Sequence, residues 1–156
     1  MPAASAASDS PLAPEIRPLP LALRLGYAGL IPFVLGSLLV WLVWPEAHPY
    51  TTMGLSAYAA VIVSFLGGIH WGIGFREPAP EPGLFIWGIV PSLVAWIAVL
   101  MPPRAGLVIH GLMLAVCYLV DRRVYPRHGL AAWLTLRFRL SAVASLSCFL
   151  GAAGSL

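Results

Sequence analysis

The chain has 156 residues, of which 60% are apolar and 10% are charged, and its formal net charge is +3. Soluble domains carry about 25% charged residues, so this composition excludes an ordinary soluble domain and is typical of a membrane protein. The basic residues, all arginine, lie at the ends of apolar segments and form no continuous basic surface. We therefore expect the lipid bilayer as the partner and no nucleic acid.

Residues 1–20 are rich in alanine, serine and proline and hold too little apolar material to form a core. We predict a disordered cytoplasmic tail here, followed by one transmembrane helical domain over residues 21–156. Asp9 and Glu15 precede the first apolar run, so the segment lacks the positive start of a secretory signal.

The rest of the chain is divided into apolar segments close to the roughly 20 residues that a helix needs to cross a bilayer. We therefore predict an all-α, polytopic membrane helix bundle with about five transmembrane helices. The segments cover residues 22–44, 52–75, 83–101, 104–120 and 138–155.

The arginines predict the orientation of this bundle. If each segment spans the membrane, Arg104 lies on one side and the other arginines lie on the opposite side: Arg17, Arg24, Arg76, Arg122, Arg123, Arg127, Arg137 and Arg139. Short cytoplasmic loops retain positive charge, so the amino terminus is expected inside and the carboxyl terminus outside. The lysine-free, alanine-rich composition suggests a high-GC bacterial genome.

Pro32 lies inside the first segment and predicts a kink near Ile31, because proline frees a helix carbonyl that must find another partner. Trp41 and Trp44 then mark the outer interface, where amphipathic rings prefer to lie.

The second segment carries a small residue at every fourth position. Such a stripe lets helices approach closely in a membrane, so we predict that this helix packs at the centre of the bundle through this face. The stripe comprises Ser56, Ala60, Ser64, Gly68 and Gly72.

The connection between the fourth and fifth segments is the longest that contains polar residues. Leu130, Trp133, Leu134 and Phe138 recur there at helical spacing and predict an amphipathic helix lying on the inner surface.

The two cysteines, Cys117 and Cys148, are expected at depths that differ by about 10 Å, too far for a disulfide. We predict that they are unpaired packing residues.

Two histidines, His70 and His110, fall inside predicted spans, where an ionisable group is a functional hypothesis because burying it is costly. Their depths differ by roughly 15 Å, so they are too far apart to ligate one haem. No Asp, Glu or Cys stands at ligand spacing from either, and we predict no metal and no cofactor. For His70 we favour a neutral imidazole that hydrogen-bonds a neighbouring helix.

Polar residues on the fourth and fifth helices leave two alternatives. In the first, a polar seam joins the two helices, with Asp121 and Arg137 paired at its inner mouth. In the second, which we favour, the hydroxyls bond to their own helix and Asp121 lies with the arginines in the headgroup layer. The residues concerned are Gly106, His110, Cys117, Asp121, Arg137, Ser141, Ser145 and Cys148.

The run SFLGGIHWG, Ser64 to Gly72, resembles a family of small proteobacterial inner-membrane proteins of unknown function with a mitochondrial inner-membrane relative. The matching pieces LGYAGLIPF and PSLVAWIAVL extend the resemblance over about residues 24–152. Ser141 stands where the family pattern suggests threonine. The resemblance implies five helices and no known activity, and it singles out Gly67, Gly68, His70, Trp71 and Arg137.

We expect a non-enzymatic protein that acts as a structural, interaction or assembly component of a membrane complex. Its partner would be a membrane protein or a second copy of the chain. The alternative is a carrier of protons or small solutes that uses His70 and His110.

Overall fold

The computed structural model describes residues 16–155, so the first fifteen residues of the predicted tail lie outside it. The described part is a bundle of long helices, and five helical stretches are long and apolar enough to cross a membrane, as predicted. The helices are α1 (Pro20–Ala28), α2 (Ile31–Leu42), α3 (His48–Gly74), α4 (Pro82–Leu100), α5 (Pro103–Val124) and α6 (Leu134–Gly154).

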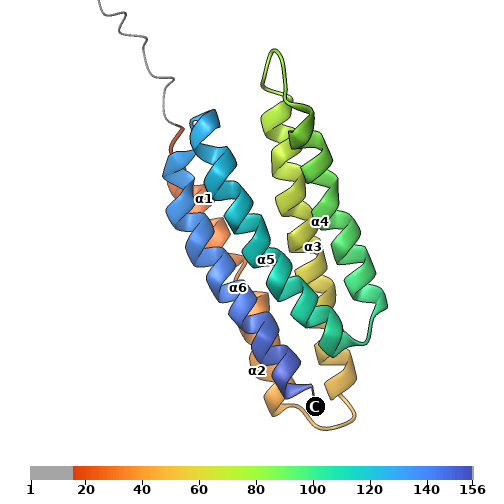
Figure 1. The fold of residues 1–156 in the computed structure, drawn as a ribbon. Coiled ribbons are helices and arrows are strands. Elements are labelled where there is room, and N and C mark those ends of the chain that lie inside the picture. The colour runs from red at the N-terminus through yellow and green to blue at the C-terminus, as the bar shows by residue number, and fades with distance from the viewer. Residues whose placement is uncertain (1–15, 156) are drawn as a thin grey trace, which may run out of the picture.

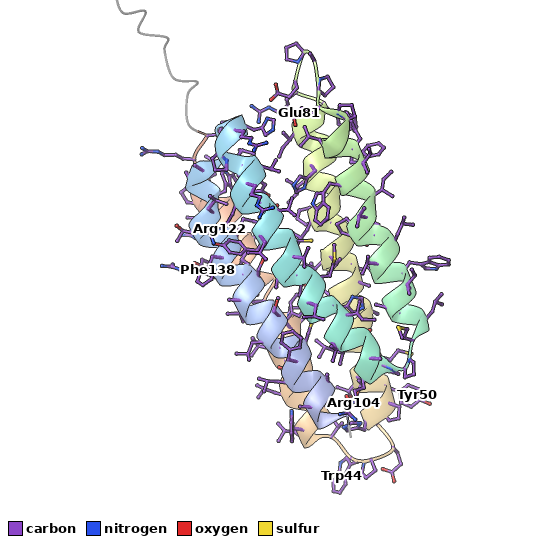
Figure 2. The ribbon with its side chains drawn as sticks, viewed as in Figure 1. Trp44, Tyr50, Glu81, Arg104, Arg122 and Phe138 are labelled. Atoms are coloured by element: carbon purple, nitrogen blue, oxygen red, sulfur yellow. The ribbon has the colours of Figure 1, made fainter. Side chains whose placement is uncertain are left out.

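The helices form two flanks joined by α5. Helices α3 and α4 lie side by side on one flank, and α6 covers the broken pair α1 and α2 on the other (Figure 1). Large apolar side chains cover the outside, among them Trp44 and Phe138 (Figure 2). Such a surface is unfavourable in water and natural in lipid.

The predicted kink in the first span is confirmed as a break between α1 and α2 at Gly29 and Leu30. The hydroxyl of Tyr58 on α3 donates a hydrogen bond of 2.8 Å to the carbonyl oxygen of Gly29. The break therefore leaves this backbone acceptor satisfied within the membrane, where an unpaired carbonyl is costly.

The small-residue stripe on α3 is only partly a packing face of the bundle. Ser56 is buried, but Gly68 and Gly72 are exposed, and a Cβ added at either would meet open space. Residues four apart advance by 400° on a helix, so the stripe drifts by about 160° between Ser56 and Gly72. The prediction of a single internal face is wrong for the inner half of the helix for this reason.

The predicted surface helix after the fourth span is also wrong. Two short 3₁₀ helices occupy this segment, η1 (Tyr125–His128) and η2 (Ala131–Trp133), and Gly129 between them has a left-handed φ of 71°. Leu134 and Phe138, predicted to lie on the surface helix, belong to α6. The turn folds Leu130 and Trp133 back onto a small apolar cluster around Tyr125, which a straight helix on the membrane surface would not allow.

Ordered structure begins before the predicted domain boundary at residue 21. The Ile16 amide donates to the Gly129 carbonyl over 2.9 Å, and the Trp133 indole donates to the Ile16 carbonyl over 2.9 Å. The end of the predicted tail is thus fixed at the inner face of the bundle.

Candidate functional site

A buried ion pair joins the carboxyl-terminal end of α5 to the amino-terminal end of α6. Asp121 lies in the last turn of α5 and Arg137 in the first turn of α6. The Nε atom of Arg137 donates to Oδ2 of Asp121 over 2.8 Å, and Nη2 of Arg137 lies 2.7 Å from the same oxygen. Asp121 is 1% exposed and Arg137 is 7% exposed. The seam hypothesis therefore gave the correct pair, which is buried between the two helices.

His70 extends this pair to α3. Its Nε2 atom lies 3.5 Å from Oδ1 of Asp121, the carboxylate oxygen that Arg137 does not use. Its Nδ1 atom lies 3.4 Å from the Leu66 carbonyl oxygen of its own helix. Both separations exceed those of strong hydrogen bonds, so His70 is held mainly by burial, at 1% exposure. His70 therefore faces a neighbouring helix, α5, and the group that it faces there is the Asp121 carboxylate. We call His70, Asp121 and Arg137 the charge network.

Two aromatic side chains enclose the imidazole of His70. The ring of Trp87 on α4 lies 6.4 Å away in an edge-on arrangement, and the ring of Tyr125 on η1 lies 6.3 Å away. The Trp87 indole N–H has no hydrogen-bond partner among residues 16–155. The charge network is therefore set in apolar surroundings, where electrostatic interactions are strong.

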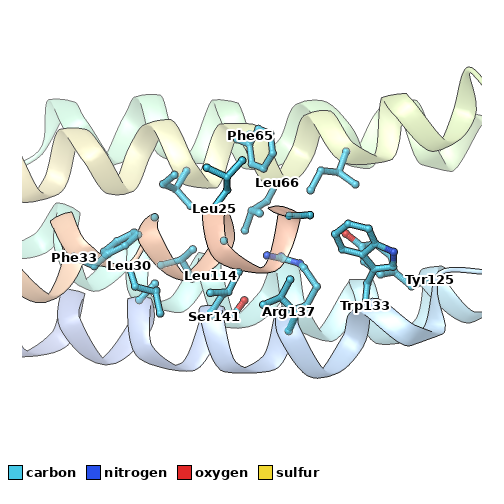
Figure 3. Close-up of a pocket in the computed structure, with 18 of the residues that line it drawn as sticks. Leu25, Leu30, Phe33, Phe65, Leu66, Leu114, Tyr125, Trp133, Arg137 and Ser141 are labelled. Carbon is cyan, nitrogen blue, oxygen red and sulfur yellow. The ribbon is translucent and has the colours of Figure 1, made fainter. Parts of the chain in front are cut away.

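An apolar pocket of about 520 Å³ lies beside the charge network and shares Arg137 with it. Its walls come from α1, α2, α3, α5, α6 and the turn that contains Tyr125 and Trp133. Figure 3 shows Arg137 and Ser141 of α6 in a wall otherwise formed by side chains such as Leu30 and Leu66. The pocket thus joins a long apolar space to a short polar stretch.

The mouth of the pocket faces the surroundings of the bundle at the level of the membrane. Leu25 on α1 and Phe65 on α3 both line the pocket and are 64% and 63% exposed. Both belong to helices long and apolar enough to span a membrane, so this exposed part of the lining lies within the spanning region. We call this space the lateral pocket.

Some other predicted site residues lie apart from the charge network. His110 is fully buried, and neither of its ring nitrogens has a partner in the described part of the chain. Neither the lateral pocket nor the shallow hollow along Tyr27 and Leu38 is lined by His70 or His110.

Gly67 and Trp71 have packing roles between α3 and α4. A Cβ on Gly67 would meet the Gly88 carbonyl oxygen, and the Trp71 indole donates to the Phe85 carbonyl oxygen over 3.0 Å.

The seam between α5 and α6 is formed in part. Ser145 donates to the Gly111 carbonyl across the two helices over 3.0 Å, so this hydroxyl does not bond to its own helix as we expected. Ser141 is 4% exposed, and its hydroxyl finds no partner within residues 16–155. Cys117 and Cys148 are free and buried, as predicted.

Sequence reasoning missed the lateral pocket and the aromatic residues around His70. In the sequence, nothing distinguishes Trp87 and Tyr125 from other aromatic residues of their segments. Only the packing of α4 and η1 brings them to the His70 imidazole. Gly26 and Gly29 also line the pocket, but their spacing alone did not indicate one.

Comparison with known proteins assigns the chain to a family. A family model described as "Protein of unknown function (DUF3429)" matches residues 19–153. The chain belongs to this family. The resemblance seen in the SFLGGIHWG run is therefore confirmed as membership of a family of unknown function, and the chain is a multi-pass membrane protein.

Among curated proteins, this DUF3429 member is similar to Transmembrane protein 69 of Xenopus tropicalis, with 41% identity over 136 residues. That match covers 81% of this chain and 51% of the frog protein. Transmembrane protein 69 of Mus musculus is 35% identical over 86 residues, which are 53% of this chain and 35% of the mouse protein. The chain thus spans about half the length of the frog relative and about a third of the mouse relative. No solved structure matches the chain.

Proposed function

We propose that this DUF3429 member is a non-enzymatic protein of the bacterial inner membrane that binds a lipid-soluble molecule in the lateral pocket. The observation that carries this proposal is the pocket itself, an apolar space of about 520 Å³ whose mouth is flanked by exposed side chains of two spanning helices. Pockets for small molecules commonly measure about 300–1,000 Å³ and combine apolar walls with few polar groups.

The position of the mouth favours a ligand that arrives through the membrane. Leu25 and Phe65 flank it, and neither presents a polar group to an entering molecule. A water-soluble solute would have to lose its hydration before entering, which costs free energy unless its polar groups find partners. A molecule already dissolved in the acyl chains has no such cost.

The charge network supports binding by fixing the polar end of the pocket. Arg137 is held by Asp121 through two close contacts, and its guanidinium is thereby restricted to one orientation. A binding site benefits from side chains that are already ordered before the ligand arrives. The network would therefore orient a ligand while leaving the backbone unchanged.

Native mass spectrometry of the protein, extracted in mild detergent from its own membranes, tests this proposal. The variant Ala22→Phe places a ring in the pocket, because Ala22 lines it. The control is Ala28→Phe on the same helix, since Ala28 is exposed and lines neither cavity described above. We expect wild type and control to retain a small hydrophobic mass that Ala22→Phe loses. A bare chain in wild type, with no added mass, would contradict the proposal.

The assembly role expected from the sequence is a second candidate, and one observation favours it. Ser64, Gly68 and Gly72 stand four apart, and the two glycines face outward into open space. Small residues at this spacing allow another membrane helix to approach closely. A helix of a different membrane protein, or of a second copy of the chain, would fit this face.

Substitution of the outward glycines separates the two candidates. Gly68→Leu/Gly72→Leu fills the small-residue face and leaves the lateral pocket untouched, while Gly54→Leu adds the same bulk in open space at the other end of α3. Loss of a co-released protein only in the double variant would support assembly. Equal results for both variants would count against it.

The carrier alternative has less support. A carrier path would need to reach His70 or His110, but neither side chain lines the lateral pocket or the hollow along Tyr27 and Leu38.

A further inference from the structure

We infer that the lateral pocket takes a molecule whose polar head is uncharged and accepts hydrogen bonds, such as a carbonyl or hydroxyl group on an apolar body. This inference rests on the proposed binding function and narrows the ligand class. Two observations support it. The charges of Arg137 and Asp121 balance each other, and the hydroxyl of Ser141 has no hydrogen-bond partner in the described chain.

The positive charge at the pocket is already balanced. Asp121 Oδ2 lies within 2.8 Å of Nε and 2.7 Å of Nη2 of Arg137, so the pair presents no net charge to the pocket. A phosphate or carboxylate beside Arg137 would also lie close to the Asp121 carboxylate. Two negative charges at such a separation in apolar surroundings repel strongly, so an anionic head is disfavoured.

A cationic head is disfavoured for a related reason. The Oδ2 atom of Asp121 is occupied by Arg137, and its Oδ1 atom faces His70 on the other side of the network. No acidic side chain lines the lateral pocket, so an ammonium group would enter beside a guanidinium without a counter-ion. Only an uncharged head avoids both penalties.

Donors for such a head are present. Ser141 lines the pocket and is 4% exposed, and its hydroxyl has no hydrogen-bond partner within the described chain. A guanidinium carries five N–H groups, more than one carboxylate oxygen can accept, so Arg137 also has hydrogens to offer. Figure 3 places Ser141 and Arg137 in the same stretch of wall. One ligand oxygen between them would satisfy both.

The arrangement also sets the direction of the ligand. Arg137 stands in the first turn of α6 and Ser141 about 10 Å from the start of that helix, whereas Phe33 and Ala144 line the pocket farther from the inner end. The head would thus lie toward the inner leaflet and the apolar body toward the middle of the membrane. A lipid-soluble molecule of the inner leaflet has this orientation before it enters.

A pair of probes that differ by one phosphate tests the head. We would titrate the full-length protein in nanodiscs of zwitterionic lipid with 1-oleoylglycerol, which is uncharged, and with 1-oleoyl lysophosphatidic acid, which is anionic, and measure binding by native mass spectrometry. The expected result is an affinity at least about tenfold higher for the uncharged probe, a difference of about 1.4 kcal/mol.

A serine pair supplies the matched variants. Ser141→Ala removes the hydroxyl from the pocket, and Ser147→Ala removes an equally buried hydroxyl of α6 that does not line it. We expect Ser141→Ala to weaken binding of 1-oleoylglycerol about fivefold, as the loss of one hydrogen bond would, and Ser147→Ala to leave it unchanged.

The outcomes separate this inference from the proposed function. Tighter binding of the anionic probe, or equal binding by both serine variants, would overturn the inference. The pocket would then still bind a ligand, but not one selected for an uncharged head. Failure of both probes, together with no hydrophobic mass retained from native membranes, would overturn the proposed function as well.

Discussion

Gly67 of α3 and Gly88 of α4 meet backbone to backbone, so the two helices approach each other closely at this point. A Cβ on Gly67 would overlap the carbonyl oxygen of Gly88, and a Cβ on Gly88 would overlap the Trp71 indole. The same approach carries Trp87, the neighbour of Gly88, to the edge of the His70 ring. The glycine contact therefore positions part of the apolar enclosure of the charge network.

The variant Gly67→Ala should destabilise the bundle, because the added methyl meets backbone that can move only if α4 shifts away. We expect a loss of about 1–3 kcal/mol, the usual cost of overpacking. Gly68→Ala is the matched control, since its methyl would enter open space. Thermal unfolding in detergent, followed by circular dichroism, measures both. Equal midpoints for the two variants would show that α3 and α4 are not in close contact.

Breaking the charge network on one side should cost more than neutralising both sides. Arg137→Gln leaves the Asp121 carboxylate buried without its cation, and we expect a loss of about 3–5 kcal/mol. In Asp121→Asn/Arg137→Gln no net charge remains buried, so stability should partly recover. Unfolding measurements on both single variants and the double variant complete the cycle. A double variant whose loss equals the sum of the single losses would contradict the pairing.

Trp133→Phe should loosen the amino-terminal segment while keeping the apolar contacts of the ring. The indole N–H donates to the Ile16 carbonyl, and phenylalanine lacks this donor. We expect faster amide hydrogen exchange at Ile16, whose N–H donates to the Gly129 carbonyl, measured by mass spectrometry of peptides that span this residue. Trp44→Phe is the control, because Trp44 is 81% exposed at the other end of the bundle (Figure 2). An unchanged exchange rate at Ile16 in Trp133→Phe would mean that this hydrogen bond does not hold the segment.

Single cysteines at the two ends of the bundle test the orientation. Cys117 and Cys148 are free but buried, so the wild-type chain should give little background with a membrane-impermeant maleimide. Glu46 and Glu81 are exposed at opposite ends. In intact spheroplasts Glu46→Cys should be labelled at once, and Glu81→Cys only after permeabilisation. The reverse order would place the amino terminus outside.

The spans were predictable because each depends on local composition. An apolar run of sufficient length must form a helix in lipid to satisfy its own backbone, whatever its neighbours do. The break just before Pro32 was predictable for the same reason, since the ring of proline acts on the preceding turn of its own helix.

Features that depend on helix rotation and on tertiary packing were not predictable. The outward direction of Gly68 and Gly72 follows from the drift of a four-residue repeat along a real helix. The burial of Arg137 requires α6 to begin at Leu134, which in turn depends on the left-handed turn at Gly129. The lateral pocket requires contributions from several helices at once. Asp121 and Arg137 were paired in one hypothesis because both lay at facing helix ends, but their burial inside the protein was not visible in the sequence.

Trp133 has two roles, since it lines the lateral pocket and its indole also holds Ile16. The point at which residues 1–15 join the bundle is therefore next to the inner end of the pocket. A bulky group attached at Ile16 would lie beside the site where a ligand head is expected. The helix α6, in contrast, ends at Gly154 at the opposite end of the bundle (Figure 1). Purification tags and fluorescent reporters for binding studies are accordingly better attached to the carboxyl end.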